Sequence, residues 1–196
     1  DGRSSHLYRN NGNGTFTDVA KVAKVLASGD KLSSVVFTDF DNRRDVDFWT
    51  VGQGGKNRLY SNQRVGTFLD IGKYLNALGS LPSQSVSTAD LDKDGRTDFL
   101  LVPERGALLW VRNLGQKNFQ VENLPSPHAG SGIRSWMSHA FDYDNDGDLD
   151  ILEIRGSNLP SSHSQAGPEL YENQSSGKFQ RVTTKTGLDQ YKGKAF

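Results

Sequence analysis

The chain has 196 residues, and its 23 Lys and Arg residues balance its 23 Asp and Glu residues, so no overall field attracts nucleic acid or an anionic membrane surface. It contains no cysteine, which excludes a disulfide framework, a thiol nucleophile and a cysteine-ligated zinc site. No apolar run approaches the roughly 18 residues of a membrane-spanning helix, so we expect no membrane span.

The first predicted elements are two short strands within residues 7–19. A Leu-Tyr-Arg-Asn segment begins at Leu7 and a Thr-Phe segment at Thr15, and the Asn-Gly-Asn-Gly turn between them is typical of a β-hairpin. Residues 17–26 are expected to form a short helical connector. The turn also contains a glycosylation sequon at Asn13.

The next unit contains four predicted strands. A strand at residues 33–38 enters an acidic loop at 39–47, a second strand leaves the loop at 47–51, and the hairpin signature returns at 59–62 and 67–68. Residues 69–78 are a second expected helical connector.

The same order recurs twice more along the chain, at residues 85–121 and 136–182. The acidic loops start at Asp39, Asp90 and Asp142, which is a period of about 51 residues, and a second sequon lies at Asn173. Four strands in each repeat are typical of a β-propeller blade, so the sequence predicts an all-β propeller.

Two of the acidic loops have the composition of a calcium site. Asp at loop positions 1, 3, 5 and 9, with Gly at position 6 and a backbone carbonyl at position 7, converges several hard oxygens on one point, as Ca²⁺ requires. The predicted ligands are Asp90, Asp92, Asp94, Asp98 and the carbonyl of Arg96 for one ion, and Asp142, Asp144, Asp146, Asp150 and the carbonyl of Asp148 for the other.

Two alternatives compete with this interpretation. Asp and Gly clusters are often ordinary solvated turns, although two full matches in repeat register, each with four mutually repelling carboxylates, count against that. The loop from Asp142 also fits an EF-hand expression with Glu153 at position 12, but its flanks are strands and not helices. Glu153 is instead expected to be an exposed strand residue.

The loop at residues 39–47 departs from the pattern at two points. Arg43 stands at position 5, and Arg44 stands where Gly is preferred. We expect this loop to bind calcium weakly or not at all, with the Arg43 guanidinium among the carboxylates in place of an ion. The degenerate set is Asp39, Asp41, Asp45 and Asp47.

The segments at residues 7–19 and 141–150 together resemble the FG-GAP/VCBS repeat family of integrin-alpha-like calcium propellers, and especially the branch of cartilage acidic protein and its bacterial relatives. The resemblance implies a seven-bladed propeller that is secreted or at the cell surface, or periplasmic in a bacterium, with calcium loops joining strands A and B of each blade. The family includes adhesion proteins, lectins and non-catalytic domains of enzymes, so it leaves the ligand open.

The repeat count predicts a single partial propeller domain over residues 1–196, with a half blade at 1–28 and blades at 29–80, 81–134 and 135–196. About three and a half blades fall short of a closed ring, which has typically 4 to 8 blades. We expect the remaining blades to come from the rest of the chain or from a second chain.

The longest connections, residues 124–134 and 156–168, should lie on the face opposite the calcium loops, where loops on a rigid scaffold can recognise a ligand. Ordinary surface insertions are an equal alternative. The expected ligand-binding residues are His128, Arg134, Trp136, Asn158 and His163.

The favoured function is a calcium-stabilised extracellular binding or adhesion module for a protein or glycan, without catalytic residues. Two alternatives remain, an accessory propeller of a carbohydrate-active enzyme or lectin, and a scaffold subunit of a large assembly.

Overall fold

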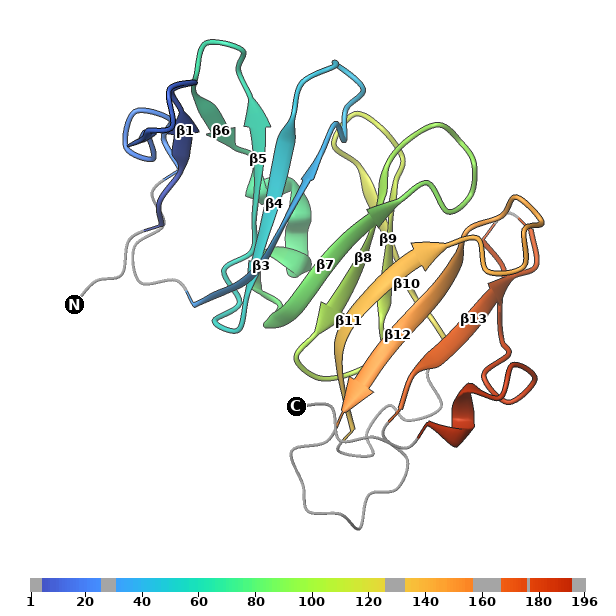
Figure 1. The fold of residues 1–196 in the computed structure, drawn as a ribbon. Helices are drawn as coiled ribbons and strands as arrows, with labels where there is room; N and C mark the ends of the chain where they lie inside the picture. Colours follow the sequence, from blue (N-terminus) through green and yellow to red (C-terminus); the bar gives the residue numbers. More distant parts are fainter. Residues whose placement is uncertain (1–4, 26–30, 126–132, 157–166, 176, 192–196) are drawn as a thin grey trace.

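A computed structural model describes residues 5–25, 31–125, 133–156, 167–175 and 177–191. Its strands form one two-stranded sheet and three four-stranded antiparallel sheets, each with its strands in sequence order. The sheets stand side by side in an arc, like blades around part of a ring (Figure 1). The predicted all-β propeller fold is confirmed for this segment.

The two-stranded sheet, called here the half blade, contains β1 (Tyr8–Asn10) and β2 (Phe16–Asp18). The other sheets are called blades 1, 2 and 3. Blade 1 contains β3 (Leu32–Thr38), β4 (Asp47–Gly52), β5 (Arg58–Asn62) and β6 (Phe68–Asp70). Blade 2 contains β7 (Ser83–Ala89), β8 (Asp98–Pro103), β9 (Leu109–Asn113) and β10 (Phe119–Asn123). Blade 3 contains β11 (Arg134–Phe141), β12 (Asp150–Gly156), β13 (Glu169–Asn173) and β14 (Phe179–Arg181).

The core lies between the blades and not within any one of them. Alternate residues of β4 and β8 point to opposite neighbours, and every residue of both strands is buried. Trp49 of blade 1 meets Phe99 of blade 2 edge to face at 4.7 Å between ring centroids. Strands covered on both faces read as continuous apolar runs, which explains the sequence of these second strands.

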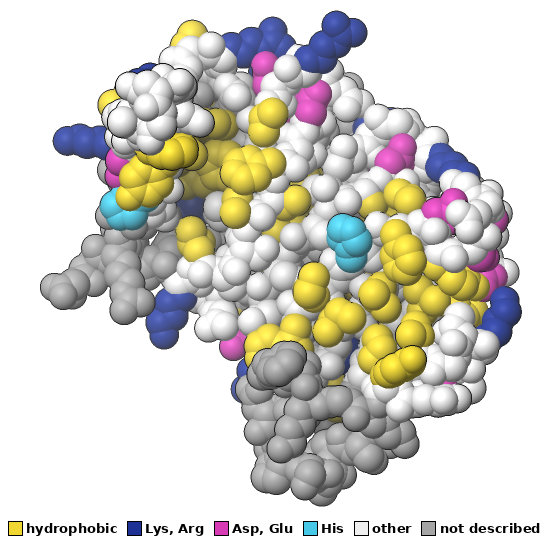
Figure 2. Space-filling model, viewed as in Figure 1, with side chains coloured by type: hydrophobic (Ala, Val, Ile, Leu, Met, Phe, Trp, Pro, Cys, Tyr) yellow, Lys and Arg dark blue, Asp and Glu magenta, His cyan; other side chains and the backbone are white. Residues whose placement is uncertain are grey.

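The two ends of the arc expose apolar surface. In β7, Val86 is buried against blade 1, whereas Val35, at the equivalent position of β3, is 49% exposed. Phe37 in β3 and Met137 in β11 are similarly exposed. Figure 2 shows apolar side chains gathered beside the half blade and over blade 3. Each end therefore has the chemistry of an inter-blade face without a neighbour.

The connectors differ from the predicted helices. Residues after β2 form turns, and residues 26–30 lie outside the described part of the chain. After β6 the chain forms a 3₁₀ helix, η1 (Gly72–Ser80), which non-helical dihedral angles at Asn76 interrupt. A second short 3₁₀ helix, η2 (Leu188–Gln190), follows β14. Within the described residues, no helix has the length and apolar character needed to cross a membrane.

The first strand of every blade has a register irregularity at the same place. The pairing shifts between Leu32 and Ser34, between Ser83 and Ser85, and between Ser135 and Met137. One residue, six positions before the first loop aspartate, is unpaired each time. The alternation of apolar residues did not indicate this bulge.

Candidate metal centre

The three acidic loops are called loop 1 (residues 39–47), loop 2 (90–98) and loop 3 (142–150). Each joins the first and second strands of its blade, and all three lie along one side of the arc (Figure 1). In each loop the two oxygens of the first Asp accept the backbone N–H groups of the fifth and sixth residues. The distances are 2.9 and 2.8 Å in loop 1, 3.1 and 2.9 Å in loop 2, and 3.2 and 3.0 Å in loop 3.

The sixth residue of each loop has a left-handed backbone. Gly95 and Gly147 adopt it readily, with φ of 80° and 88°, and Arg44 adopts it with φ of 63°. This backbone conformation is nearly free of strain for Gly, which has no Cβ, whereas it costs a residue such as Arg about 1–2 kcal/mol. Loop 1 therefore keeps the shape of the other two although its sequence lacks the glycine.

Loop 2 places the carboxylates of Asp90, Asp92 and Asp94 together, with one oxygen of each within 4.8 Å of the others. Arg112 pairs with Oδ2 of Asp92, and Arg96 with Oδ2 of Asp94. Oδ1 of Asp92 is buried and has no hydrogen-bond partner. A buried carboxylate oxygen without a donor fits a site for a cation.

Loop 3 brings Asp142, Asp144 and Asp146 equally close. The loop contains five aspartates and no basic residue. Lys93 reaches across from loop 2 and pairs with Asp148, and this proximity raises the pKa of the lysine. Loop 3 thus keeps the largest excess of negative charge among the three loops, which favours a divalent cation.

The ninth residues, Asp98 and Asp150, lie apart from these clusters. Asp98 accepts Asn113 N at 2.8 Å and Trp110 Nε1 at 2.9 Å, and Asp150 accepts Asn173 N at 2.8 Å and Tyr143 N at 2.9 Å. Burial raises the pKa of Asp98 to about 6 and also raises that of Asp150. In this structure both side chains fasten the end of the third strand to the loop.

The seventh residues of loops 2 and 3, predicted to offer carbonyl oxygens, are each fixed by a local turn. Arg96 N donates to Asp94 Oδ1, and Asp148 N donates to Asp146 Oδ1, both at 2.8 Å. The fifth aspartates therefore hold the seventh residues in the same way in both loops.

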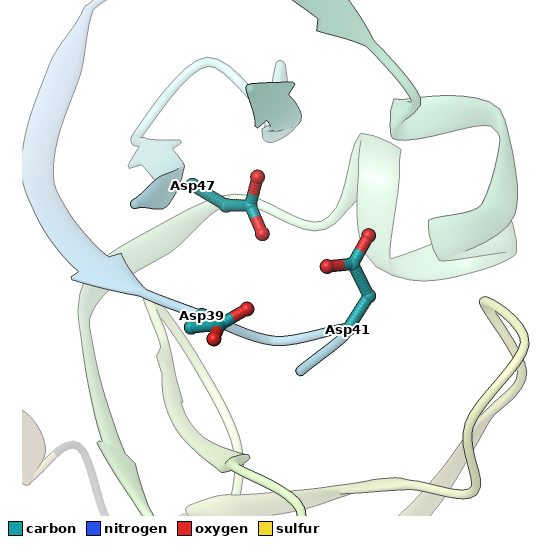
Figure 3. Close-up of side chains that lie close together, drawn as sticks. All are labelled: Asp39, Asp41 and Asp47. Atoms are coloured by element: carbon teal, nitrogen blue, oxygen red, sulfur yellow. The ribbon is translucent and has the colours of Figure 1, made fainter. Parts of the chain in front are cut away.

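Loop 1 gathers a different set, Asp39, Asp41 and Asp47, again with oxygens within 4.8 Å of one another (Figure 3). The Arg43 guanidinium, expected among these carboxylates, bonds to Asp41, and its charge opposes the rise that burial causes in the pKa of Asp47. Its Nε donates to Asp41 Oδ2 at 2.7 Å, and its Nη2 donates to Ser61 Oγ at 2.7 Å. Asp45 points elsewhere and pairs with Arg64 at 2.7 Å.

Neighbouring blades are joined beside these loops by asparagines that end the third strand. Asn113 Nδ2 donates to the Phe40 carbonyl of loop 1 at 2.6 Å, and Asn173 Nδ2 donates to the Leu91 carbonyl of loop 2 at 3.0 Å. The fourth loop residue adds a link in the other direction, since Asn42 Nδ2 donates to the Gly95 carbonyl at 3.0 Å. These contacts connect loop 1 to blade 2 and loop 2 to blade 3.

The same asparagine bonds decide the accessibility of one sequon. Asn173 is only 2% exposed and its amide is bonded to two carbonyls, so the folded chain cannot present it for glycosylation. Asn13 is exposed on the turn of the half blade.

The opposite face is described in part. Arg134 is 42% exposed, with Glu104 Oε1 at 3.9 Å from its Nη1. Trp136 is the unpaired residue of the β11 bulge and is half-buried, and its indole Nε1 is buried without a hydrogen-bond partner among the described residues. His128, Asn158 and His163 lie outside the described residues.

One polar cluster was missed by sequence reasoning. Glu153 was expected to be exposed, but it is fully buried and accepts hydrogen bonds from Ser135 Oγ and, at 2.9 Å, from Tyr171 OH. Arg155 and Glu169 form a buried ion pair beside it. The repeat alignment does indicate that these residues are buried. Glu153 and Arg155 occupy the positions of Leu101 and Pro103 in blade 2, on a strand that is covered on both faces.

Comparison with protein families gives one result that bears on these loops. The model described as the FG-GAP-like repeat matches twice, at residues 39–101 and 90–153. Each match begins at the first aspartate of one loop and runs through the next loop, so together they span more than half of the chain and all three loops. No curated protein matches the chain.

Proposed function

Since the chain belongs to the FG-GAP-like repeat family, we propose that it is a calcium-stabilised propeller segment that acts outside cells as a binding or adhesion module. Repeats of this family are typical of extracellular, integrin-like propellers. Calcium at extracellular modules binds at about 10⁻⁴ to 10⁻³ M, so such sites are filled outside cells and mostly empty in cytosol.

Calcium is assigned to loops 2 and 3. Asp90, Asp92 and Asp94 would hold one ion, and Asp142, Asp144 and Asp146 the other, with the carbonyls of the seventh residues as further oxygen ligands. The single observation that carries this proposal is the buried, unpartnered Oδ1 of Asp92, which lies within a cluster of three carboxylates. A bound cation removes both the repulsion and the unsatisfied oxygen.

The ions would act on stability and not on chemistry. Each loop joins the first two strands of a blade, and loop 2 also accepts a bond from Asn173 of the next blade. An ion in loop 2 would therefore hold both connections, and an ion in loop 3 would hold the first. Binding to the native state alone stabilises it by about 2.7 kcal/mol for each site when free calcium is 100 times the dissociation constant.

Ligand recognition is assigned to the face opposite the loops, and no catalytic role is proposed. The support is the exposed guanidinium of Arg134, which suits a polar protein or glycan surface. His128, Asn158 and His163 belong to the same proposed surface through their connections in the sequence.

Completion of the ring by further blades is also part of the proposal. The half blade has only two strands, and beside it lies an apolar hollow of about 290 Å³ whose walls include Val35, Phe37, Phe48 and Tyr60. Asn62 is the counterpart of Asn113 and Asn173, and among the described residues its Nδ2 donates only to the Val46 carbonyl of its own blade, at 3.0 Å. A loop carbonyl of a preceding blade would give Asn62 the bond that Asn113 and Asn173 make. That blade would come from the rest of the chain or from a second chain.

Calorimetric titration of the chain with CaCl₂ tests the ion sites. Asp92→Asn and Asp144→Asn should each remove one binding event and the corresponding gain in melting temperature, whereas the control Glu104→Gln, outside all loops, should change neither. Identical melting temperatures with calcium and with chelator would refute structural calcium.

Binding arrays of glycans and of extracellular proteins test the second face. Trp136→Ala should weaken the interaction with a retained ligand at least tenfold, and the control Val65→Ala, an exposed residue of blade 1, should not. Turnover of any arrayed glycan would overturn the non-enzymatic assignment and favour a carbohydrate-active enzyme.

A further inference from the structure

We propose that Asn13 is a site of spontaneous deamidation, at which the turn of the half blade converts its own asparagine into aspartate or isoaspartate. The chain contains two Asn-Gly pairs, Asn11-Gly12 and Asn13-Gly14, and both lie in this turn between β1 and β2. A glycine after asparagine favours the reaction because no Cβ hinders the approach of its backbone nitrogen. The sequence does not distinguish the two pairs, whereas the structure does.

The reaction needs only water, hydroxide and groups of the turn. The backbone nitrogen of Gly14 loses its proton to hydroxide and attacks Cγ of Asn13, so that an N–Cγ bond forms and negative charge collects on Oδ1. The Cγ–Nδ2 bond then breaks, and the amide nitrogen takes up a proton from water and leaves as ammonia. Water opens the resulting succinimide at either carbonyl, which gives aspartate or isoaspartate.

Two donors already point at the oxygen of Asn13 on which this charge develops. Thr15 N donates to Asn13 Oδ1 at 3.1 Å, and the Thr15 hydroxyl donates to the same oxygen at 2.6 Å. Donors that are in place before the reaction stabilise a developing oxyanion and so lower the barrier to attack on the carbonyl carbon. The side-chain carbonyl of Asn13 is therefore activated by its own turn.

The nucleophile and the leaving group at Asn13 are free to move. Asn13 and Gly14 are both exposed. Among the described residues, no acceptor binds Asn13 Nδ2 and no acceptor binds Gly14 N. The space beside Gly14 is also open, since a Cβ built there would meet nothing within 4 Å. Ring closure at this pair therefore needs no hydrogen bond of the nucleophile or of the leaving group to break.

The neighbouring pair is held in a conformation that opposes ring closure. Asn11 Nδ2 donates to the hydroxyls of Thr15 at 2.9 Å and Thr17 at 3.0 Å. Gly12 N, which would be the nucleophile, donates to Asn10 Oδ1 at 2.8 Å. Attack at Asn11 must break these bonds, and each bond that breaks slows the reaction by about two- to tenfold.

Deamidation at Asn13 changes the chemistry of the turn. It adds one negative charge, and the isoaspartate product also adds a carbon atom to the main chain of the hairpin. The amide nitrogen that leaves is the one to which a glycan would be attached at this sequon, so the deamidated turn is no longer a glycosylation acceptor. The exposed sequon therefore has a limited lifetime while it carries no glycan.

The test is incubation of the full, unglycosylated chain in mildly alkaline buffer. Peptide fragmentation in the mass spectrometer separates the two positions, and isoaspartyl methyltransferase labelling detects isoaspartate. In the folded chain we expect Asn13 to deamidate about tenfold faster than Asn11 or more. In the chain unfolded in guanidinium chloride the two rates should become similar, because both residues precede glycine and the bonds of the turn are lost.

The variant Thr15→Val should move the two rates in opposite directions. It removes the hydroxyl that donates to Asn13 and accepts from Asn11, so deamidation should slow about two- to tenfold at Asn13 and accelerate at Asn11. The matched control is Thr67→Val in the turn of blade 1, where Gln63 N donates to the Thr67 carbonyl as Asn11 N does to that of Thr15. It should change neither rate.

Three results would overturn the inference. They are equal rates at Asn11 and Asn13 in the folded chain, faster deamidation at Asn11, and no reaction at Asn13 under conditions in which the unfolded chain reacts. Unchanged rates in Thr15→Val would overturn the activation of Asn13 by the hydroxyl. The comparison of folded with unfolded chain needs no variant, so it remains decisive even if Thr15→Val disturbs the turn.

Discussion

Replacement of Asn113 by alanine should show how strongly the blades depend on the asparagine contacts beside the acidic loops. Asn113 is 1% exposed, and its Nδ2 donates to Phe40 of the preceding blade at 2.6 Å and to Thr97 at 3.1 Å. Its Oδ1 accepts Gly115 N at 3.0 Å. Asn113→Ala therefore removes three hydrogen bonds and leaves buried backbone groups without partners.

The expected loss of unfolding free energy is about 3 kcal/mol, because each hydrogen bond contributes about 0.5–1.5 kcal/mol and unpaired buried groups cost more. The matched control is Asn62→Ala. Within the described part of the chain, the Asn62 side chain makes two hydrogen bonds, to the Val46 carbonyl at 3.0 Å and from Arg64 N at 2.9 Å, and both are exposed. Water can replace them, so the control should lose about 1 kcal/mol.

Urea denaturation followed by tryptophan fluorescence, with and without calcium, measures both values. Differences of this size correspond to about 2–4 °C in melting temperature for each kcal/mol in a chain of this length. Equal losses for the two variants, within about 0.5 kcal/mol, would refute the reasoning that the bond to the preceding blade matters.

Three further predictions follow from single positions. Gly177→Ala should destabilise the chain by about 2–4 kcal/mol, because φ is 81° and a Cβ would lie 2.2 Å from the Trp110 ring. The control Gly66→Ala, with φ of 76° and open space around the residue, should cost only the backbone strain. Thermal melts compare the two variants, and equal losses of stability would show that the ring contact does not matter. In chelator, the contribution of Asp98 to the free energy of unfolding should be greatest below about pH 4 and should be lost as the pH rises to about 6, because burial raises its pKa from 3.8 to about 6 and the native state holds a proton that the unfolded state has released. Urea denaturation at a series of pH values should show this part of the slope disappear in Asp98→Asn, and an unchanged slope would contradict the assignment. Folded chain incubated with an oligosaccharyltransferase should carry no glycan at Asn173, as peptide mass spectrometry can check, and modification there would show that the site opens.

The fold was predictable because its information is periodic. The acidic loops at a spacing of about 51 residues and the Leu-Tyr and Phe hairpins gave the strand order of each blade without any long-range contact. The bulge in the first strand was not predictable, because a single unpaired residue such as Ser33 or Gln84 leaves no pattern in composition. The third strand of blade 2 lacks the Leu-Tyr pair, and the strand pairing places Trp110 and Val111 at the positions of Leu59 and Tyr60.

The sequence predicted which aspartates form the candidate site, but not which of their oxygens accept hydrogen bonds. Position along the loop identified the first, third and fifth aspartates of loops 2 and 3, which the structure gathers. The position of an aspartate in the loop could not say which of its oxygens would be occupied. That depends on a donor from a different strand, such as Trp110 in blade 2 and its absence at Leu59 in blade 1.

The asparagine and loop contacts make the blades a linear array in which each blade contacts its immediate neighbours. Asn113 and Asn173 both contact the preceding blade, and Asn42 and Lys93 both contact the following blade, so the junctions between blades 1 and 2 and between blades 2 and 3 are built alike. In such a linear array the stability is a sum over units and junctions, and order propagates from one unit to the next. An ion bound in one loop should therefore also stabilise the following blade, because it fixes the carbonyl group that accepts that blade's asparagine.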